Sequence, residues 1–502
     1  MKRRHFMTGL AAAPLATGLN AAHAGGLYWK PARSGDPVIL SSPATAWPNA
    51  FREVRNEYEC ELPMRVPSQL RGVLYRNGPA LMKLGDTSYH HWLDGDGMVH
   101  AFRFEEGRLR HRAKLVATSK LQAEQAAGRR LAPGFGTSIP GTAVTNPDAM
   151  NAANISTLQL NGELLALWEG GPPYVLDPGT LATVGKKAWS PETAQLPFSA
   201  HPRVAPDGTV WSFGYLPGAG ALALYELSPQ GTLQRQAFVP APNADMVHDF
   251  AITERYLVFV LMPYRYAPSD ELSLSFIGHY AWQANQPGYV LVVDKATLAP
   301  VAQIACDPIG LFHLGNAWEV GNTVRVGVAR YADFTDVLRR SGTVMDNSML
   351  PWSETRWTEL EIDLAGGKVL ASTPFAGTVE FPRYDQRRTG QPTRYTYMLA
   401  SSASADAPLF GFNVLRCFDQ QTGQVQDHDF GPQFMAEEHV FVPEPGSTQE
   451  NRGWLVGTAH DWVRRRTVMS IFDATHVAAG PIDQVTLPYS LPLGLHGQFY
   501  ST

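Results

Sequence analysis

Short runs of β-forming residues recur along most of the chain and restrict its possible folds more than any other feature. Each run is alternating or apolar and is stopped by Gly, Pro, Asn or Asp. Examples are GTVWSFGY (208–215), YLVFVLM (256–262), GYVLVVD (288–294), TVRVGVARY (323–331), GWLVGTAHDW (453–462) and TVMSIFD (467–473). Runs of this length, rich in Val, Tyr, Phe and Trp, are typical of strands. The sequence therefore predicts an all-β protein.

Helical spacing is clear only in TSKLQAEQAAGRRL (118–131) and weaker in DFTDVLRRSG (333–342). Strands that recur regularly over 502 residues indicate a closed radial array, a β-propeller, more than a two-sheet sandwich. One hairpin element looks as if it recurs between blades, as LDPGTLATVG, VDKATLAP and DLAGGKVL. No linker rich in Pro, Ser or Gly divides the chain, so we expect one domain with its longer loops on one face.

The N-terminus predicts an export signal. Arg3 and Arg4 precede a short apolar stretch and an A-x-A cleavage site at 22–24. Phe6 after the arginine pair favours the twin-arginine pathway over the Sec pathway, and hence a periplasmic location. No segment reaches the roughly 20 apolar residues of a membrane-spanning helix. The sequence thus predicts three segments: a signal peptide over 1–24, an N-terminal extension over 25–49 and a propeller over 50–502.

Charge and cysteine content exclude two classes of protein. The net charge is -5 and no basic run follows the N-terminus, so we expect no nucleic-acid partner. Charged residues make up 17% of the chain, below the roughly 25% usual in soluble domains, which favours a large core or a partly apolar surface. Cys60, Cys306 and Cys417 are too few and too scattered for a disulfide framework or a zinc knuckle, and we expect them to be buried.

Four of the fifteen histidines share a setting in or beside an apolar segment at a predicted strand end. They are His201 in SAHPRV, His248 in MVHDFAI, His313 in GLFHLGNAWE and His496 in GLHGQFY. A lone histidine there is usually a core residue, but the innermost strands of a propeller converge on its axis, where distant ligands can meet. Imidazole suits iron, copper, nickel and zinc, and zinc catalysis usually takes only three protein ligands. Four imidazoles in an octahedral site leave two positions for dioxygen or water, which favours iron(II).

Three glutamates also lie in apolar strand contexts: Glu169 in LLALWEGGPP, Glu380 in TVEFPRY and Glu438 in AEEHVFVP. An unpaired buried carboxylate is costly, so each needs a partner. A metal-bound histidine usually donates its second ring N–H to a carboxylate, which would supply one. A structural salt bridge to an arginine such as Arg383 is the alternative.

Nine segments, taken in order, resemble the landmarks of the carotenoid cleavage oxygenases from about residue 50 to the end of the chain. They are LYRNGPA, HHWLDGDGMVHAFRF, LLALWEGGPPYVLDPGTLATVG, AHPRVAPDGTVWSFGY, MVHDFAIT, FHLGNAWE, EFPRYD, EEHVFVP and GLHGQF. The resemblance implies a seven-bladed propeller with a loop and helix cap over one face. It implies a non-haem iron(II) bound by His201, His248, His313 and His496. It also implies that the last three of these histidines pair with Glu169, Glu380 and Glu438, and that the glycines flanking His496 let the backbone crowd the axis.

The chain departs from this family's pattern at several positions. His439 follows Glu438 where members often have proline, and we expect it to point away from the metal. The ANT segment of the family is here ANI, so Ile155 is expected to shield an open metal position. We interpret Asp94 and Asp96 as ties between loops, with a calcium-like site as the alternative, because D-x-D alone is a weak signal.

The resemblance also implies the reaction: dioxygen cleaves one conjugated C=C bond of a carotenoid or apocarotenoid and gives two aldehydes or ketones. The chemistry occurs at the metal, without a protein acid or base, in an apolar tunnel that holds the polyene. A stilbene or phenylpropene is the alternative substrate, and Lys120 is then the candidate for phenol binding.

Two hypotheses lie outside this reaction class: a non-catalytic propeller that binds an apolar ligand, and a calcium-dependent hydrolase, which would need axial carboxylates. Because carotenoids reside in membranes, we expect an apolar patch at the tunnel mouth to contact lipid, and the candidate is 271–282.

Overall fold

The structure is a computed structural model that describes residues 54–502 except 143, 145, 270, 272, 332, 344, 346–351, 373–376 and 403–410. The predicted signal peptide over 1–24 and the extension over 25–49 lie outside the described residues. None of the helices in the described part of the chain has the length and apolarity needed to cross a membrane.

Seven antiparallel sheets form the blades, and each blade runs from an innermost strand at the axis to an outermost strand. From the axis outwards, blade 1 contains β33 (Gly497–Ser501), β2 (Gly72–Leu81), β5 (Asp96–Glu105), β6 (Arg108–Leu115) and β1 (Glu57–Pro63). In the same direction, blade 2 contains β7 (Ser156–Leu160), β8 (Glu163–Leu167), β9 (Tyr174–Leu176) and β10 (Thr183–Lys186). Blade 3 contains β11 (Arg203–Val204), β12 (Val210–Tyr215), β13 (Ala221–Leu227) and β14 (Leu233–Pro240).

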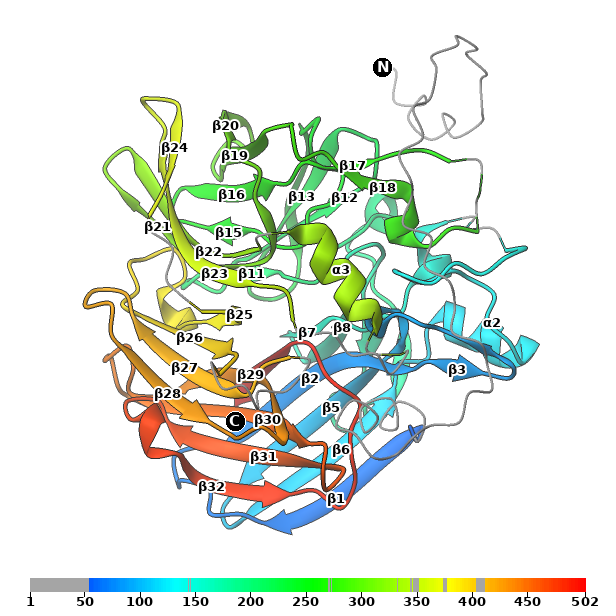
Figure 1. Ribbon diagram of the computed structural model, residues 1–502, viewed down its shortest axis with the longest axis vertical. Helices are drawn as coiled ribbons and strands as arrows, with labels where there is room; N and C mark the ends of the chain where they lie inside the picture. The colour runs from blue at the N-terminus through cyan, green and yellow to red at the C-terminus, as the bar shows by residue number, and fades with distance from the viewer. Residues whose placement is uncertain are drawn as a thin grey trace. The chain divides into compact units, whose positions relative to one another are not determined.

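The other four blades continue around the ring (Figure 1). Blade 4 contains β15 (Ala251–Ile252), β16 (Tyr256–Leu261), β19 (Gly288–Asp294) and β20 (Pro300–Cys306). Blade 5 contains β21 (Gly310–Val320), β22 (Thr323–Tyr331), β23 (Thr355–Asp363) and β24 (Lys368–Ala371). Blade 6 contains β25 (Val379–Arg383), β26 (Tyr395–Ala400), β27 (Val414–Asp419) and β28 (Val425–Asp429). Blade 7 contains β29 (Phe434–Pro443), β30 (Gly453–Asp461), β31 (Arg466–Asp473) and β32 (Pro481–Thr486).

The last strand of the chain closes the ring. β33 pairs with β2, with Tyr75 opposite Gln498, so the two ends of the described chain share blade 1. The innermost strands contact one another from blade to blade, as β33 does with β7 and β29, and β21 does with β15 and β25. The predicted all-β, seven-bladed propeller is therefore confirmed, and each quoted run forms a strand.

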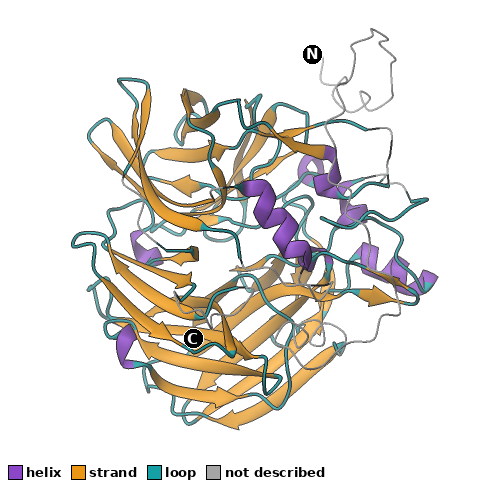
Figure 2. Cartoon of the chain, in the orientation of Figure 1, coloured by secondary structure: helices purple, strands orange, loops and turns teal. Residues whose placement is uncertain are grey.

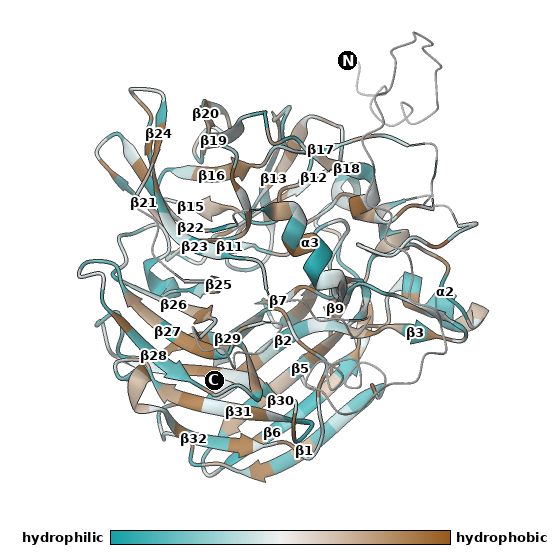
Figure 3. Ribbon diagram, viewed as in Figure 1, coloured by the Kyte–Doolittle hydropathy of each residue, from teal (hydrophilic) through white to brown (hydrophobic). Residues whose placement is uncertain are grey.

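Burial follows the position of a strand in its blade. All six residues of β12 and all nine of β30 are buried, whereas the outermost strand β28 alternates between exposed and half-buried residues. Figure 3 shows the same contrast by hydropathy, with β27 largely hydrophobic and its outer neighbour β28 largely hydrophilic. The apolar runs of the sequence thus form the interior, because the inner strands of a blade are covered on both faces by the adjacent blades.

Two α-helices are described, at the two places where the sequence predicts them (Figure 2). Helix α2 (Ser119–Ala127) begins after Thr118, whose side chain accepts a hydrogen bond from the Leu121 N–H, and ends at Gly128 in a left-handed conformation. Helix α3 (Phe334–Thr343) follows β22 and lies over the centre of the ring in Figure 1. It forms part of the cap that the sequence leads us to expect.

Short elements complete the described chain. Two small two-stranded sheets are formed by β3 (Lys83–Leu84) with β4 (Thr87–Ser88) and by β17 (Tyr264–Tyr266) with β18 (Tyr280–Trp282). The single-turn helices are η1 (Trp92–Asp94), η2 (Pro147–Met150), η3 (Pro191–Thr193), η4 (Phe276–His279), η5 (Gln386–Arg388) and η6 (Val477–Ala479). Of the cysteines, Cys417 is buried as expected, whereas Cys60 and Cys306 are half-buried.

The recurring hairpin lies within blades and not between them, which corrects the sequence interpretation. It joins the third strand to the outermost strand in blades 2, 4 and 5. In each turn an aspartate side chain accepts hydrogen bonds from backbone N–H groups two or three residues further along the chain. These aspartates are Asp177, Asp294 and Asp363. The motif occurs once in each of these three blades because the turn is local to the outer hairpin.

Candidate metal centre

The four selected histidines converge at the axis. Each comes from the innermost strand of a different blade or from the residues just before it: blades 3, 4, 5 and 1 in chain order. One ring nitrogen of each lies within 4.8 Å of the corresponding nitrogens of the other three. The Nε2 atoms of His201 and His248 are 3.0 Å apart, and those of His313 and His496 are 3.1 Å apart.

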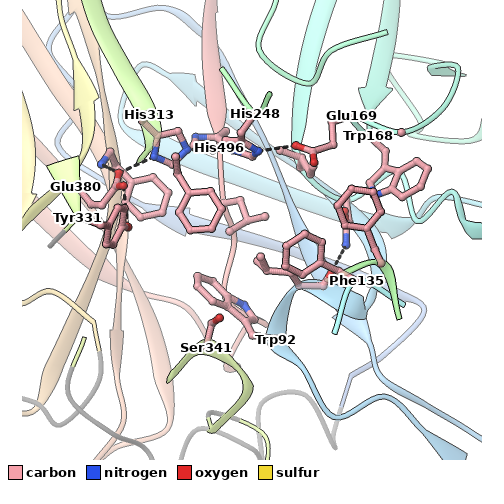
Figure 4. Close-up of a pocket in the computed structure, with 18 of the residues that line it drawn as sticks. Trp92, Phe135, Trp168, Glu169, His248, His313, Tyr331, Ser341, Glu380 and His496 are labelled. Carbon is pink, nitrogen blue, oxygen red and sulfur yellow. Dashed lines mark hydrogen bonds and ion pairs between the residues drawn. The ribbon is translucent and has the colours of Figure 1, made fainter. Parts of the chain in front are cut away.

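Three of these histidines are held by a carboxylate at the opposite ring nitrogen. His248 Nδ1 is 2.5 Å from Glu169 Oε2, and His313 Nδ1 is 2.5 Å from Glu380 Oε2; Figure 4 shows these two pairs. His496 Nδ1 is 2.9 Å from Glu438 Oε1. Among the described residues, no carboxylate pairs with His201. A carboxylate accepts only, so each of the three Nδ1 atoms donates and each Nε2 presents a lone pair to the axis.

The backbone is irregular where these side chains enter the axis. The register of blade 5 shifts between Leu311 and Leu314, around His313, and that of blade 7 shifts between Ala436 and His439, around Glu438. Blade 6 shifts after Glu380, where Phe381 has a φ of 55°. Such bulges redirect side chains that strict alternation would send to the opposite face, and they concentrate at functional sites.

The second oxygen of each carboxylate is also bound. Tyr215 donates to Glu169 Oε1 at 3.0 Å, and Tyr331 donates to Glu380 Oε1 at 2.8 Å. Glu438 uses other partners.

The Gly497 N–H donates to Glu438 Oε2 at 2.8 Å, and the Arg383 guanidinium lies 3.2 Å from Oε1. The sequence allows a histidine partner or a salt bridge to Arg383 as alternatives for these glutamates. Glu438 has both, because it contacts Arg383 and His496. These bonds fix the carboxylates, and through them the imidazole planes.

Burial and neighbouring charges set the protonation of Glu438, His496 and His201. Burial would raise the pKa of Glu438, but the Arg383 charge and the bonds with His496 lower it to about 2. Burial lowers the pKa of His496 to about 4, against the opposing charge of Glu438, and burial and its histidine neighbours lower that of His201 well below its usual value. His496 and His201 are therefore neutral near pH 7, which is the form of imidazole that binds metals.

The donor chemistry fits a transition-metal cation. His313 and His496 both donate through Nδ1, and their Nε2 atoms lie 3.1 Å apart. Glu380 raises the pKa of His313, so a proton on His313 Nε2 can bridge this contact, and a cation bound by both nitrogens would take its place. Four neutral imidazoles suit iron, copper, nickel or zinc, whereas hard cations such as calcium prefer oxygen ligands.

An apolar cavity opens on the histidines (Figure 4). It spans about 810 Å³, including space open to solvent, and aromatic and aliphatic side chains dominate its wall. Apart from the metal-centre residues, the wall includes Trp92, Leu93, Phe135, Asn154, Ile155, Trp168, Phe276, Phe312, Ser341, Trp352, Phe381 and Leu495. The predicted shielding residue Ile155 is thus in the wall, and its carbonyl accepts the His496 N–H at 3.2 Å.

Lys120, the candidate for phenol binding, is not among the described residues that line this cavity. Its Nζ lies 2.7 Å from Asp96 Oδ1 and 3.1 Å from Glu124 Oε2, and the Arg130 guanidinium binds the same two carboxylates. The group is fully enclosed against the ring of Tyr89. A buried ammonium needs this pairing, and the structure therefore corrects the sequence hypothesis: Lys120 is a structural cation.

The remaining sequence hypotheses concern residues near the centre. His439 points away from it, since its Nδ1 bonds the Glu437 carbonyl at 2.7 Å and its ring packs beside Phe430 and Phe472. Asp94 joins two loops by accepting the Gly136 N–H at 2.7 Å and the Thr137 hydroxyl. Asp96 pairs with Lys120 and Arg130, so neither aspartate presents a free carboxylate for calcium.

Two tyrosines of the centre, Tyr215 and Tyr331, are missed by sequence reasoning. Each lies at the end of an apolar strand, where tyrosine is an ordinary core residue. Only the pairing of their hydroxyls with Glu169 and Glu380 distinguishes them, and no local signal carries it.

The fold and the centre together define a class: a seven-bladed propeller with four convergent, carboxylate-supported histidines under an apolar cavity. The family described as retinal pigment epithelial membrane protein (RPE65) matches residues 51–501. The chain therefore belongs to the RPE65 and carotenoid cleavage oxygenase family, as its nine segments predict.

Known relatives agree with this assignment. The chain is 32% identical over 464 residues to apocarotenoid-15,15'-oxygenase of Synechocystis sp., covering 87% of this chain and 92% of that protein. It is 26% identical over 467 residues to lignostilbene-alpha,beta-dioxygenase isozyme III of Sphingomonas paucimobilis, covering 88% and 93%. The solved structure of cobalt-substituted Synechocystis ACO matches with a TM-score of 0.81 at 29% identity, covering 92% of this chain and 99% of that one.

Proposed function

We propose that this protein is a non-haem iron(II) dioxygenase that cleaves one conjugated C=C bond of a carotenoid or apocarotenoid. One oxygen atom of O₂ enters each of the two carbonyl products, so the atoms balance without a further reductant. The observation that carries the proposal is the convergence of four imidazoles beneath an apolar cavity. The family and the similarity to an apocarotenoid oxygenase support the reaction class.

His201, His248, His313 and His496 would hold the iron. A ferrous ion in this site would supply the redox chemistry that activates dioxygen. The cobalt-substituted form of a relative supports a divalent metal in such proteins. Glu169, Glu380 and Glu438 keep three imidazoles oriented with their Nε2 lone pairs towards the axis.

The cavity residues position the substrate and exclude water. A polyene has no charged group to anchor, so its register depends on the shape of a wall such as that formed by Trp92, Phe135 and Phe312. Holding one double bond beside the metal centre selects which bond is cleaved. Ile155 narrows the approach next to His496.

Stilbene or phenylpropene cleavage is the second candidate, supported by the similarity to lignostilbene-alpha,beta-dioxygenase. It requires recognition of a phenol. Lys120 is committed to Asp96 and Glu124, and no Lys or Arg is among the described residues of the cavity wall. This favours a polyene over a phenolate.

A comparison of three candidate substrates, each tested separately, examines the proposal directly. The protein is loaded with iron(II) without oxygen and mixed with oxygen and one of three compounds: a long carotenoid, an apocarotenal or a hydroxystilbene. We expect oxygen uptake and two carbonyl products, identified by mass spectrometry, with the carotenoid or the apocarotenal. Cleavage of the hydroxystilbene alone would establish the second candidate. Binding of a ligand with no oxygen uptake from any compound would establish a non-catalytic propeller.

Glu380→Gln is expected to weaken iron binding by about 10- to 100-fold, because the amide orients His313 less strongly than the carboxylate does. Retained iron is measured against a chelator of known affinity. The matched control is Glu361→Gln, which removes one charge from the partly exposed pair with Arg325 and is expected to retain wild-type affinity. Equal affinity in the Glu380 variant and the wild type would refute the orienting role.

We also propose export to the periplasm through the twin-arginine signal at 1–24, and peripheral contact with a membrane through 271–282. The described part of 271–282 includes Phe276, which lines the cavity, and Ile277 beside it is half-buried. A segment that is partly exposed and borders the cavity suits transfer of an apolar substrate from lipid.

A further inference from the structure

The cavity wall contains few polar side chains outside the metal centre. Indole nitrogens aside, the described wall offers Asn154 and Ser341. The amide nitrogen of Asn154 donates to the Leu93 carbonyl at 2.9 Å and to the Gly95 carbonyl at 2.8 Å, which ties it to the loop before β5. Ser341 comes from helix α3 and lies beside Trp92, on the side of the pocket away from the histidines (Figure 4).

The hydrogen bonds that Ser341 already makes leave its hydroxyl oxygen able to accept one more. Its hydroxyl donates to the Val337 carbonyl at 2.9 Å or the Leu338 carbonyl at 3.0 Å, the usual bond of a helical serine to the preceding turn. The Oγ atom lies 3.0 Å from His91 Nε2. Its single proton is therefore used within the helix.

The state of His91 is fixed by its other contacts. Its Nδ1 accepts the Leu93 N–H at 3.2 Å, so the ring proton resides on Nε2 and is shared between Ser341 Oγ and the Leu338 carbonyl. Burial lowers the pKa of His91, which keeps the ring neutral with one N–H. A hydroxyl oxygen has two lone pairs, and His91 occupies one of them. Ser341 Oγ thus has one acceptor site left and no proton to donate.

We propose that Ser341 is a specificity-determining residue that accepts a hydrogen bond from a hydroxyl group at the end of the substrate remote from the histidines. The proposal rests on the proposed function and narrows its substrate class to polyenes with a hydroxylated end. An aldehyde or ketone end offers only acceptors and gains nothing from Oγ. Anchoring one end in this way would also fix which double bond lies at the metal centre.

Ligand binding without turnover tests this proposal separately from the reaction. The probes are three apocarotenals that differ only in the ring: one with a hydroxyl, one with a ketone and one with no ring oxygen. Each quenches the fluorescence of the cavity tryptophans, and titration without oxygen gives Kd. We expect the wild type to prefer the hydroxylated probe over the unsubstituted one. In Ser341→Ala the Kd of the hydroxylated probe should rise by about 3- to 10-fold, the usual range for one hydrogen bond, which removes the preference. The Kd of the unsubstituted probe should stay unchanged.

Two control variants keep the test decisive. Ser341→Thr retains the hydroxyl and should retain the preference, which covers a failure of Ser341→Ala to fold. Ser353→Ala removes a buried hydroxyl that bonds Asp336 on the same helix but is not in the described cavity wall, and it should leave the preference unchanged. Equal weakening of all probes in Ser341→Ala, or a wild-type preference for the ketone, would overturn the proposal. Oxygen uptake with the same probes reports separately on the proposed function, because binding needs no reaction.

Discussion

His248→Ala is expected to abolish iron binding and, with it, oxygen uptake. The substitution removes one of four ring-nitrogen donors and, among the described residues, leaves the carboxylate of Glu169 with the Tyr215 hydroxyl as its hydrogen-bond partner. Loss of a donor atom must exceed the about 10- to 100-fold effect expected for an orienting partner. Metal content after purification in iron-supplemented medium, measured by plasma mass spectrometry, should fall to background.

His439→Ala is the matched control for this prediction. His439 is more buried than the four ligand candidates and follows Glu438, but its ring bonds the Glu437 carbonyl and faces Phe430. We expect this variant to keep its iron. A His248 variant with full metal content, or a His439 variant without metal, would contradict the assignment of the centre.

Arg76→Met is expected to lower the free energy of unfolding by about 3–5 kcal/mol, because it leaves a buried carboxylate unpaired. Arg76 Nη1 donates to Glu437 Oε2 at 2.8 Å, and both side chains are almost fully buried. The Gly494 N–H donates to the same carboxylate at 2.8 Å. A β-carbon at Gly494 would lie 2.1 Å from the guanidinium, so this glycine is required for the close approach. The defect should therefore also displace His496, two residues further on.

Denaturant unfolding measures this effect, and two variants interpret it. Arg76→Met combined with Glu437→Met removes both charges and should be clearly less destabilised than the single variant. Arg356→Met breaks an exposed pair with Glu354, where each side chain is 55% exposed, and should cost no more than about 1 kcal/mol. If the double variant is no more stable than Arg76→Met, the unpaired charge is not the cause.

The strands and the centre differ in how well sequence could predict them. Strand runs such as 256–262 and 323–331 carry their own signal, because an apolar run between turn residues is local. The histidines could be selected by their settings, but His201 and His496 are almost 300 positions apart, and only the closed ring brings them together. The closed seven-bladed ring, and with it the convergence of the histidines, is predicted from the resemblance to a known family.

Other contacts carried no local signal. Tyr215 and Tyr331 look like core residues until their hydroxyls are placed beside carboxylates. Lys120 looks like a free cation on a helix, but the fold brings Asp96 from β5 to within 2.7 Å of it. The sequence defines the charge of a side chain, whereas its partner depends on which blade and loop lie next to it.

Closure of the ring by β33 has a consequence for assembly of the metal centre. His496 immediately precedes β33, so its imidazole reaches the axis only when β33 completes blade 1. A nascent chain that stops before about residue 490 has three of the four imidazoles and an open circle of sheets. Such a chain would lack a complete metal centre, and the inner edge of β2 would have no partner strand in blade 1.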